Sequence, residues 1–334
     1  MEPTLNRRQF VSSFGALTAI GPQAVLAQPS PGRPRRVGLM MAIAESDPEG
    51  QHRAQSFRQS LEETGWVDGR NVAIDVAWYS GDLHRAQTAA KDFADNQVDV
   101  IVVNGTPGMD ALRTLGTNIP IVFVVVTDPV AAGFVTNLSR PGANVTGFST
   151  FEPEIAGKWQ QLLSQMAPDL KNINMLIDPK FTTFNSLWKV VEEIAPKQGM
   201  VPHPAYASSL PEIEHALEVI SKQPAPGLIV SPSPVNTVNR QRLIALANQN
   251  RIPAIFPFRF YVRDGALMAY GFDAADQFKR AATYVGRILK GERTGDLPVQ
   301  GPSLYEFGIN LSTAKAMGLT VPNALLIAAN EIVQ

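Results

Sequence analysis

From Arg36 onward, short apolar segments alternate with helical segments, and this alternation constrains the fold more than any other feature of the sequence. The strand-like Val98–Val103 is followed by the helical Pro107–Leu115 and then by the strand-like Ile119–Val126. Strands that are apolar along their whole length are typical of parallel sheets covered by helices on both faces. The alternation pauses at the Pro/Gly turn in Ser139–Thr150 and then resumes. The pattern therefore predicts an α/β protein with two doubly wound lobes.

The N-terminal residues have the three parts of an export signal. Arg7 and Arg8 form a twin-arginine pair, a mildly apolar stretch follows over Val11–Ile20, and Val25-Leu26-Ala27 is a small-residue cleavage site. Such signals are addresses read by a receptor and are removed from the mature chain. We expect residues 1–27 to be a twin-arginine signal peptide cleaved near Ala27, and residues 28–35 to be a Pro/Gly/Arg linker.

Charge and composition exclude several classes of partner. The formal net charge is −1, without a basic stretch, so no nucleic-acid partner is expected. The chain has no cysteine, which excludes disulfides, thiolate catalysis and a lipid anchor on an N-terminal cysteine. No segment of the mature chain has the roughly 18 consecutive apolar residues that a membrane span needs. We therefore expect a free periplasmic protein.

Several strands end in a small polar residue followed by proline. Proline suits the first turn of a helix, and the residue before it can cap that helix. Helix starts at the carboxyl ends of parallel strands are where open α/β sheets bind ligands, anions among them. At the first of these, Gly105 allows close backbone approach and Thr106 adds a hydroxyl, which together suit a carboxylate. The four predicted helix starts are Thr106-Pro107, Asp128-Pro129, Asp178-Pro179 and Ser231-Pro232.

Catalytic and metal-binding patterns are missing from the sequence. There is no G-x-S-x-G elbow, no Walker A motif and no G-x-G-x-x-G. None of the four histidines lies within four residues of another, so no helical histidine pair for zinc occurs. We expect no catalytic residue, metal or cofactor, and interpret the chain as a binding protein.

Aromatic residues gather after the strands of the second lobe. They suit either the walls of a site for a flat apolar ligand or the packing of the core. Asp273 opens a helix, and it either caps that helix or pairs with a ligand ammonium. The aromatic residues are Phe181, Phe184, Phe256, Phe258, Phe260, Tyr261 and Tyr270.

Three stretches resemble a known family. "NGTPGMDALRTLGTNIPIVFVVVTDPVAAGFVTNLSRPGANVTGFS", over Asn104–Ser149, resembles the core signature of ABC-transporter substrate-binding proteins of the tryptophan/tyrosine-uptake type. "GWVDGRNVAIDVAW", over Gly65–Trp78, is similar to the N-terminal part of that family. "RILKGERTGDLPVQ" and "GINLSTAKAMGLTVPNALLIAANEIV" resemble its C-terminal stretch.

The resemblance implies a type I periplasmic-binding-protein fold, with two Rossmann-like lobes joined by a three-strand hinge. We place the three crossings near residues 148, 266 and 297. The N-terminal lobe then comprises residues 36–147 and 267–296, and the C-terminal lobe residues 148–266 and 297–334. The resemblance also implies a permease and an ATPase of the inner membrane as partners. We expect the protein itself to be a monomer.

The resemblance further indicates where a ligand would bind. Gly105 and Thr106 match the place where related amino-acid binders hold the ligand carboxylate, and Asp273 matches a position available to the ammonium. Other ligand contacts are expected from strand ends and connecting loops. These residues are Glu45, Ser46, Thr127, Asp128, Phe181, Asn185, Ser231, Phe258 and Tyr270.

The sequence thus predicts a periplasmic solute receptor that binds a small carboxylate-bearing solute, an amino acid or an aromatic or hydrophobic acid. Hinge closure would bury the ligand without making or breaking a bond. Three alternatives stay open at this point. They are a ligand-binding protein for a membrane signalling receptor, an exported α/β enzyme, and a sugar-binding regulator of related fold.

Overall fold

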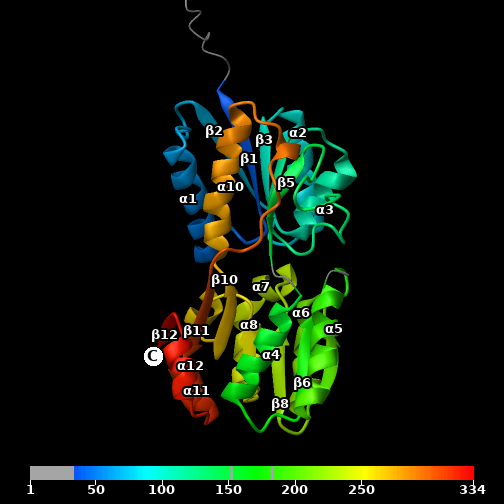
Figure 1. The fold of residues 1–334 in the computed structure, drawn as a ribbon, viewed down its shortest axis with the longest axis vertical. Helices are drawn as coiled ribbons and strands as arrows, with labels where there is room; N and C mark the ends of the chain where they lie inside the picture. The colour runs from blue at the N-terminus through cyan, green and yellow to red at the C-terminus, as the bar shows by residue number, and fades with distance from the viewer. Residues whose placement is uncertain (1–33, 151–152, 182–183) are drawn as a thin grey trace, which may run out of the picture. The chain divides into compact units, whose positions relative to one another are not determined.

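The computed structural model describes residues 34–150, 153–181 and 184–334. The predicted signal peptide with its cleavage site, and nearly all of the predicted linker, lie outside the described residues. Two parallel-rich sheets form within the described chain, and each is the centre of one lobe (Figure 1). This confirms the α/β fold with two doubly wound lobes that the alternation of strands and helices predicts.

The N-terminal lobe contains a five-stranded parallel sheet in the order β2-β1-β3-β4-β5. Its central strands are apolar throughout, and the residues of β3 are all buried. A strand buried on both faces must be covered by helices on both sides. The strands are β1 (Arg35–Met41), β2 (Val72–Trp78), β3 (Val100–Asn104), β4 (Ile121–Val126) and β5 (Val145–Ser149).

Two pairs of helices cover this sheet. On one face, Phe57 of α1 and Phe278 of α10 share a core with Val37 and Val100. On the other face, α2 and α3 pack a second core, and Figure 1 shows the two pairs on opposite sides. The helices are α1 (Pro48–Glu63), α2 (Leu83–Asp95), α3 (Thr106–Leu115) and α10 (Ala274–Leu289).

The C-terminal lobe contains a seven-stranded sheet in the order β12-β11-β10-β9-β8-β6-β7. The sheet is parallel except that β11 and β12, which are parallel to each other, run antiparallel to the other five strands. One large core surrounds it. The strands are β6 (Asn172–Ile177), β7 (Val201–Tyr206), β8 (Pro226–Val230), β9 (Ala254–Phe256), β10 (Met268–Phe272), β11 (Tyr305–Asn310) and β12 (Glu331–Val333).

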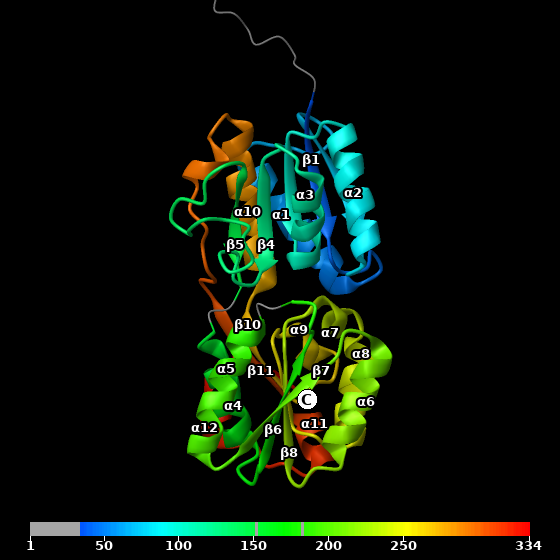
Figure 2. The ribbon, with the colours of Figure 1, turned by 90° about the vertical axis from the view of Figure 1, so that its right-hand side faces the viewer.

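Helices cover both faces of the second sheet as well. Figure 2 shows α4, α5 and α12 on one side and α6 and α8 on the other. The helices of this lobe are α4 (Ile155–Met166), α5 (Phe184–Ile194), α6 (Leu210–Ser221), α7 (Pro234–Val238), α8 (Arg240–Gln249), α9 (Phe260–Arg263), α11 (Leu311–Met317) and α12 (Asn323–Ala328).

The chain passes between the sheets three times, which gives the predicted three-segment hinge. The first passage follows Ser149, the second lies at Asp273 between β10 and α10, and the third follows Gln300, which bridges to Phe148 of β5. The second passage differs from the position near 266 that the sequence predicts, because β10 is a strand of the C-terminal sheet. The third falls after residue 300 and not at 297.

The helix starts predicted at strand ends differ from the structure in detail. At Thr106-Pro107 the helix does begin at Thr106, but the cap is Gly105. Asp128-Pro129 opens a turn and not a helix over Val130–Leu138, although Asp128 accepts a hydrogen bond from the Ala131 N–H at 3.0 Å, as a helix cap would.

The other two predicted starts are displaced along the chain. Asp178-Pro179 leads into a connecting segment, and the next helix in the described chain is α5, which begins at Phe184. After Ser231-Pro232, α7 begins at Pro234, where the Ser233 side chain is the cap. None of the helices among the described residues has the length and hydropathy that crossing a membrane requires.

Candidate ligand-binding site

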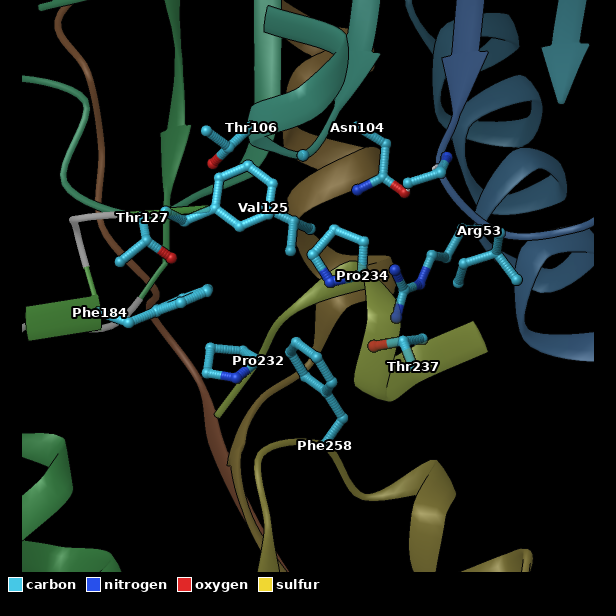
Figure 3. A pocket seen from close by; sticks show the side chains of 14 residues that line it. Arg53, Asn104, Thr106, Val125, Thr127, Phe184, Pro232, Pro234, Thr237 and Phe258 are labelled. Carbon is cyan, nitrogen blue, oxygen red and sulfur yellow. Dashed lines mark hydrogen bonds between the residues drawn. The ribbon is translucent and has the colours of Figure 1, made fainter. Parts of the chain in front are cut away.

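A pocket lies where the carboxyl ends of strands from both sheets face each other (Figure 3). Its cavity volume is about 40 Å³, which is room for a few water molecules. The side chains of the two lobes therefore nearly meet there. The lining residues are Ala42, Ile43, Arg53, Asn104, Gly105, Thr106, Val125 and Thr127 from the N-terminal lobe, and Phe181, Phe184, Pro232, Pro234, Thr237 and Phe258 from the C-terminal lobe.

The junction of β3 and α3 forms one wall of this inner pocket. Gly105 caps α3 with φ 87° and ψ 161°, a conformation that is essentially restricted to glycine. No side chain caps this helix end. The missing side chain at Gly105 therefore allows both the turn into α3 and close approach to the start of the helix.

Tyr79 holds this junction from behind. Its hydroxyl donates a hydrogen bond to the Asn104 carbonyl and accepts one from the Gly108 N–H, and burial raises the pKa of Tyr79 well above its usual value. The Asn104 side-chain oxygen accepts a bond from the Ala42 N–H at 3.3 Å. This leaves the Asn104 amide nitrogen on the pocket side, as Figure 3 shows.

The end of β4 is irregular and projects a side chain into the pocket. Val125 has φ 57°, which is strained for a β-branched residue, and the strand register shifts there. Gln277 of α10 accepts a hydrogen bond from the Val125 N–H at 2.9 Å and donates one to the Ser149 carbonyl at 2.6 Å. Val125 packs against the cores of both lobes. The hinge segment after β5 is thus tied to a pocket residue through one buried glutamine.

Arg53 of α1 is the one charged residue among the described residues that line the inner pocket. Its side chain is 3% exposed, and its Nε donates to Glu49 at 2.7 Å. The guanidinium lies over the rings of Phe258 and Phe260, with its carbon 5.7 and 5.6 Å from the ring centres. Figure 3 shows it extending toward Pro234 and Thr237. Arg53 therefore belongs to one lobe and packs on aromatic residues of the other.

The C-terminal wall is mainly apolar. Phe181 and Phe184 meet edge to face with ring centres 6.0 Å apart, and Phe258 stacks on Phe260. Thr237 adds a hydroxyl that donates to the Ser233 carbonyl at 3.1 Å and accepts from Tyr261 at 3.0 Å. A flat apolar ligand body would be complementary to these surfaces.

A larger groove adjoins the inner pocket and shares Phe181 and Pro234 with it. This outer groove has a cavity volume of about 680 Å³ and residues of both lobes along it, Asp82 and Asp110 from one and Lys180 and Asn239 from the other among them. Asp178, at the end of β6, also lines it. Burial raises the pKa of Asp178, and the hydrogen bond from the Lys180 N–H opposes that rise.

The structure brings together five of the residues that the sequence predicts as ligand contacts. Gly105 and Thr106 line the inner pocket at the start of α3, and Thr127 lines it beyond β4. Phe181 and Phe258 line it from the other lobe. Residues more than 150 positions apart in the chain thus meet in one place, as the topology of facing strand ends requires.

The other predicted contacts lie outside the inner pocket. Glu45 and Ser46, in the loop before α1, and Asn185, in the first turn of α5, are exposed. Asp128 caps the turn described above. Ser231 is fully buried, and its carbonyl and hydroxyl both accept hydrogen bonds from the Asn236 amide.

Tyr270 and Asp273 are also engaged elsewhere. The Tyr270 carbonyl accepts a hydrogen bond from the Trp159 indole at 2.6 Å, and its ring stacks on Tyr305. Asp273 accepts a bond from the Ala275 N–H and caps α10, which is the first of the two roles left open for it. It lines a separate hollow with Glu49, His52 and Arg263.

Sequence reasoning missed several lining residues, above all Arg53, Asn104 and Val125. Arg53 follows Glu49 by four positions on a helix, a spacing that usually marks a solvated ion pair. Nothing local distinguishes it, because its burial results from Phe258, about two hundred residues away in the chain. Among the described residues, no group of three or more potential metal-ligating side chains occurs.

Two doubly wound lobes, three connections and a pocket between facing strand ends define the class of type I periplasmic binding proteins. The chain belongs to the ABC transporter substrate binding protein family, whose sequence profile matches residues 40–333. This confirms the family that the sequence resembles.

Individual relatives agree with that assignment. The chain is 28% identical over 286 residues to a tyrosine-binding protein of Clostridioides difficile, a match covering 83% of this chain and 80% of that protein. A conserved domain protein of Vibrio cholerae has 29% identity and a TM-score of 0.83, with 90% of this chain and 100% of that chain covered. A Streptococcus domain in complex with L-Trp, 23% identical, shares the fold with a TM-score of 0.82 over 90% and 100% of the two chains. The family and its tyrosine-binding member are solute-binding proteins, which confirms the expectation of a binding protein and not an enzyme.

Proposed function

We propose that this protein is the solute-binding component of an ABC uptake transporter and binds a small carboxylate-bearing solute in its inner pocket. The observation that carries this proposal is the pocket itself. Members of its family bind solutes, and this pocket combines aromatic walls with one buried arginine. A few polar groups set in an apolar pocket are typical of a specific small-molecule site.

Within that class, we favour an amino acid with an aromatic or large apolar side chain. Phe181, Phe184 and Phe258 offer ring faces and edges for such a side chain. Arg53, Asn104, Thr106 and Thr127 provide charged and polar groups for the polar atoms of such a ligand. The relative of known specificity, from Clostridioides difficile, is named for tyrosine, which supports the same ligand class.

The inner pocket is smaller here than an amino acid, so the lobes part to admit the ligand and then close around it less far than in this structure. The ligand would enter through the outer groove when the lobes separate about the three connections, and closure would bury it. A permease and an ATPase of the inner membrane would then receive the closed, loaded protein. No covalent step is involved.

We place the mature protein in the periplasm as a free monomer. The family supports a location outside the cytoplasm. The twin-arginine pair at Arg7 and Arg8, with a cleavage site near Ala27, supports export in the folded state.

A ligand screen tests this proposal. Purified mature protein is titrated by calorimetry with tyrosine, tryptophan, phenylalanine, leucine, indole-3-propionate and 4-hydroxyphenylacetate, with ribose and myo-inositol as neutral controls. We expect micromolar or tighter binding of at least one acid, and a melting temperature that rises with its concentration. Binding of the sugars alone, or of none of these compounds, would overturn the proposal.

A further inference from the structure

We infer that Arg53 binds the carboxylate of the ligand and makes the protein selective for acids over their neutral derivatives. This inference rests on the proposed function and assigns one ligand group to one side chain. The geometry behind it is a buried guanidinium that lines the inner pocket and whose Nη2 has no hydrogen-bond partner among the described residues.

The environment of Arg53 satisfies part of its side chain. Nε donates to Glu49 at 2.7 Å, and the rings of Phe258 and Phe260 cover the guanidinium. The terminal nitrogen Nη2 is buried and has no hydrogen-bond partner among the described residues. A buried donor on a charged group is costly when unpaired, because the folded protein has removed its water without replacing it. Such an atom beside a pocket indicates that the pocket's ligand supplies the acceptor.

A carboxylate is the acceptor that best matches this nitrogen. Arginine and carboxylate form short, charge-assisted hydrogen bonds, which are about twice as strong as neutral ones. Arg53 is the one charged residue among the described lining residues, so an anionic ligand meets no carboxylate on the pocket wall. Glu49 does not line the inner pocket, and its carboxylate accepts from Nε and not from Nη2.

The start of α3, which the sequence favours for the carboxylate, offers fewer donors than a helix end usually does. The Gly105 N–H bonds to the Val124 carbonyl at 2.8 Å, and Pro107 has no N–H. The Gly108 N–H is taken by the Tyr79 hydroxyl. In the view of Figure 3, Thr106 and Thr127 lie at one end of the pocket and Arg53 at the other. We therefore assign the carboxylate to Arg53 and a neutral polar group of the ligand to the start of α3.

The position of Arg53 also links recognition to closure. The residue belongs to the N-terminal lobe, whereas Phe258 and Phe260 belong to the other, so the guanidinium acquires its aromatic cover when the lobes meet. A carboxylate held by Arg53 in the closed state lies in a water-poor site, where its attraction to the guanidinium is strongest.

The experiment compares acids with their amides in matched arginine variants. Calorimetry measures tyrosine, tryptophan and phenylalanine against tyrosinamide, tryptophanamide and phenylalaninamide. The variants are wild type, Arg53→Gln, and Arg240→Gln as the control. Arg240 also lies over Phe260, at 5.2 Å, and also joins the lobes, but it does not line the inner pocket.

Wild type should bind the acid at least tenfold more tightly than the amide. Arg53→Gln should weaken acid binding about 10- to 100-fold and amide binding only slightly. Arg240→Gln should weaken both by the same factor, because it affects closure and not the ligand. Glu49→Gln should not lower the preference for the acid, since it leaves the charge of Arg53 in place.

Two results would overturn this inference while leaving the proposed function intact. One is an Arg53→Gln variant that loses acid and amide binding equally, which would make Arg53 a closure residue only. The other is wild type that binds the amide as tightly as the acid, a comparison that needs no folded variant. Failure of every acid to bind wild type would instead overturn the proposed function, and the Arg53 site with it.

Discussion

Arg240 of α8 donates hydrogen bonds to both carboxylate oxygens of Asp47, from Nη1 at 2.5 Å and from Nη2 at 3.0 Å, and thereby joins the two lobes. The side chains are only 10% and 11% exposed. Nε of Arg240 donates in addition to Asp264 of its own lobe at 2.6 Å. Burial lowers the pKa of Arg240, but the hydrogen bonds to the two carboxylates outweigh that effect and raise it.

The pair between Arg240 and Asp47 should help hold the lobes closed. When the lobes part, both groups regain water, so the pair contributes to the difference between closed and open states and not to the folding of either lobe. Breaking one partner of a well-formed buried pair is costly because the other charge stays desolvated. The chain avoids part of this cost, since Arg240 keeps Asp264 as a partner when the lobes separate.

Asp47→Asn should weaken ligand binding because it destabilises the closed state relative to the open state. Asparagine can still accept the bond from the Glu49 N–H that caps α1, so the fold should be retained. Loss of the charge should reduce affinity about tenfold, for acids and amides alike. Calorimetry gives the affinity, and small-angle scattering should show a larger radius of gyration than wild type at subsaturating ligand.

Asp264→Asn is the matched control, because Asp264 contacts the same arginine from within the C-terminal lobe. It should change the affinity much less than Asp47→Asn. Equal effects of the two substitutions, or wild-type affinity in Asp47→Asn, would contradict a role for the interlobe pair in closure.

The fold could be predicted because its signals are local. Apolar strands such as Val100–Asn104 and Ile121–Val126 are recognisable in a short window, and so are the helices between them. Facing strand ends then place Gly105, Thr106 and Thr127 at the site without knowledge of any contact. The sequence places the second passage near residue 266 and not at Asp273, because no local pattern shows that β10 pairs with β9 and β11 of the C-terminal sheet.

The chemistry of the site could not be predicted in the same way. Arg53 is buried by Phe258 and Phe260, which lie about two hundred residues further along the chain. No local sequence pattern predicts a contact over that distance. In the sequence, Val125 has the pattern of an ordinary strand residue. In the structure it has a positive φ, which accompanies the register shift of β4 and the hydrogen bond to Gln277 on a distant helix. Asp128-Pro129 has the same residue types as a helix start but forms an Asp-capped turn.

Asp178 should make the folding stability depend on pH. The group is 3% exposed, and burial raises its pKa in the folded state above the unfolded value of about 3.9. Ionisation therefore costs the folded state more than the unfolded state. That cost is present above the folded pKa and fades as the pH falls toward the unfolded value.

Asp178→Asn should remove this cost while its side-chain oxygen still accepts the Lys180 N–H bond. The free energy of unfolding of the variant should be higher than that of wild type. The difference should be largest at about pH 7 and should shrink toward pH ~4. Urea titrations at a series of pH values measure it. A difference that stays constant, or that grows as the pH falls, would contradict the assignment.

Arg7→Lys together with Arg8→Lys should trap the protein in the cytoplasm as precursor. The twin-arginine pair is read by its receptor as a sequence, so the retained charge should not rescue export. Cell fractionation with an antibody against the mature chain measures the outcome, and Arg35→Lys, beyond the predicted cleavage site, is the control. Normal periplasmic accumulation of the double variant would rule out the predicted route.

Thr106→Val tests the start of α3 against Arg53 as the carboxylate site. Valine keeps the shape of threonine, and the fold should be unaffected because Gly105, and not Thr106, caps α3. If a neutral ligand group binds here, the lost hydrogen bond should weaken tyrosine and tyrosinamide equally, by about 2- to 10-fold. A loss tenfold larger for tyrosine than for its amide would place the carboxylate at Gly105 and Thr106, where the sequence alone predicts it, and would refute the assignment to Arg53.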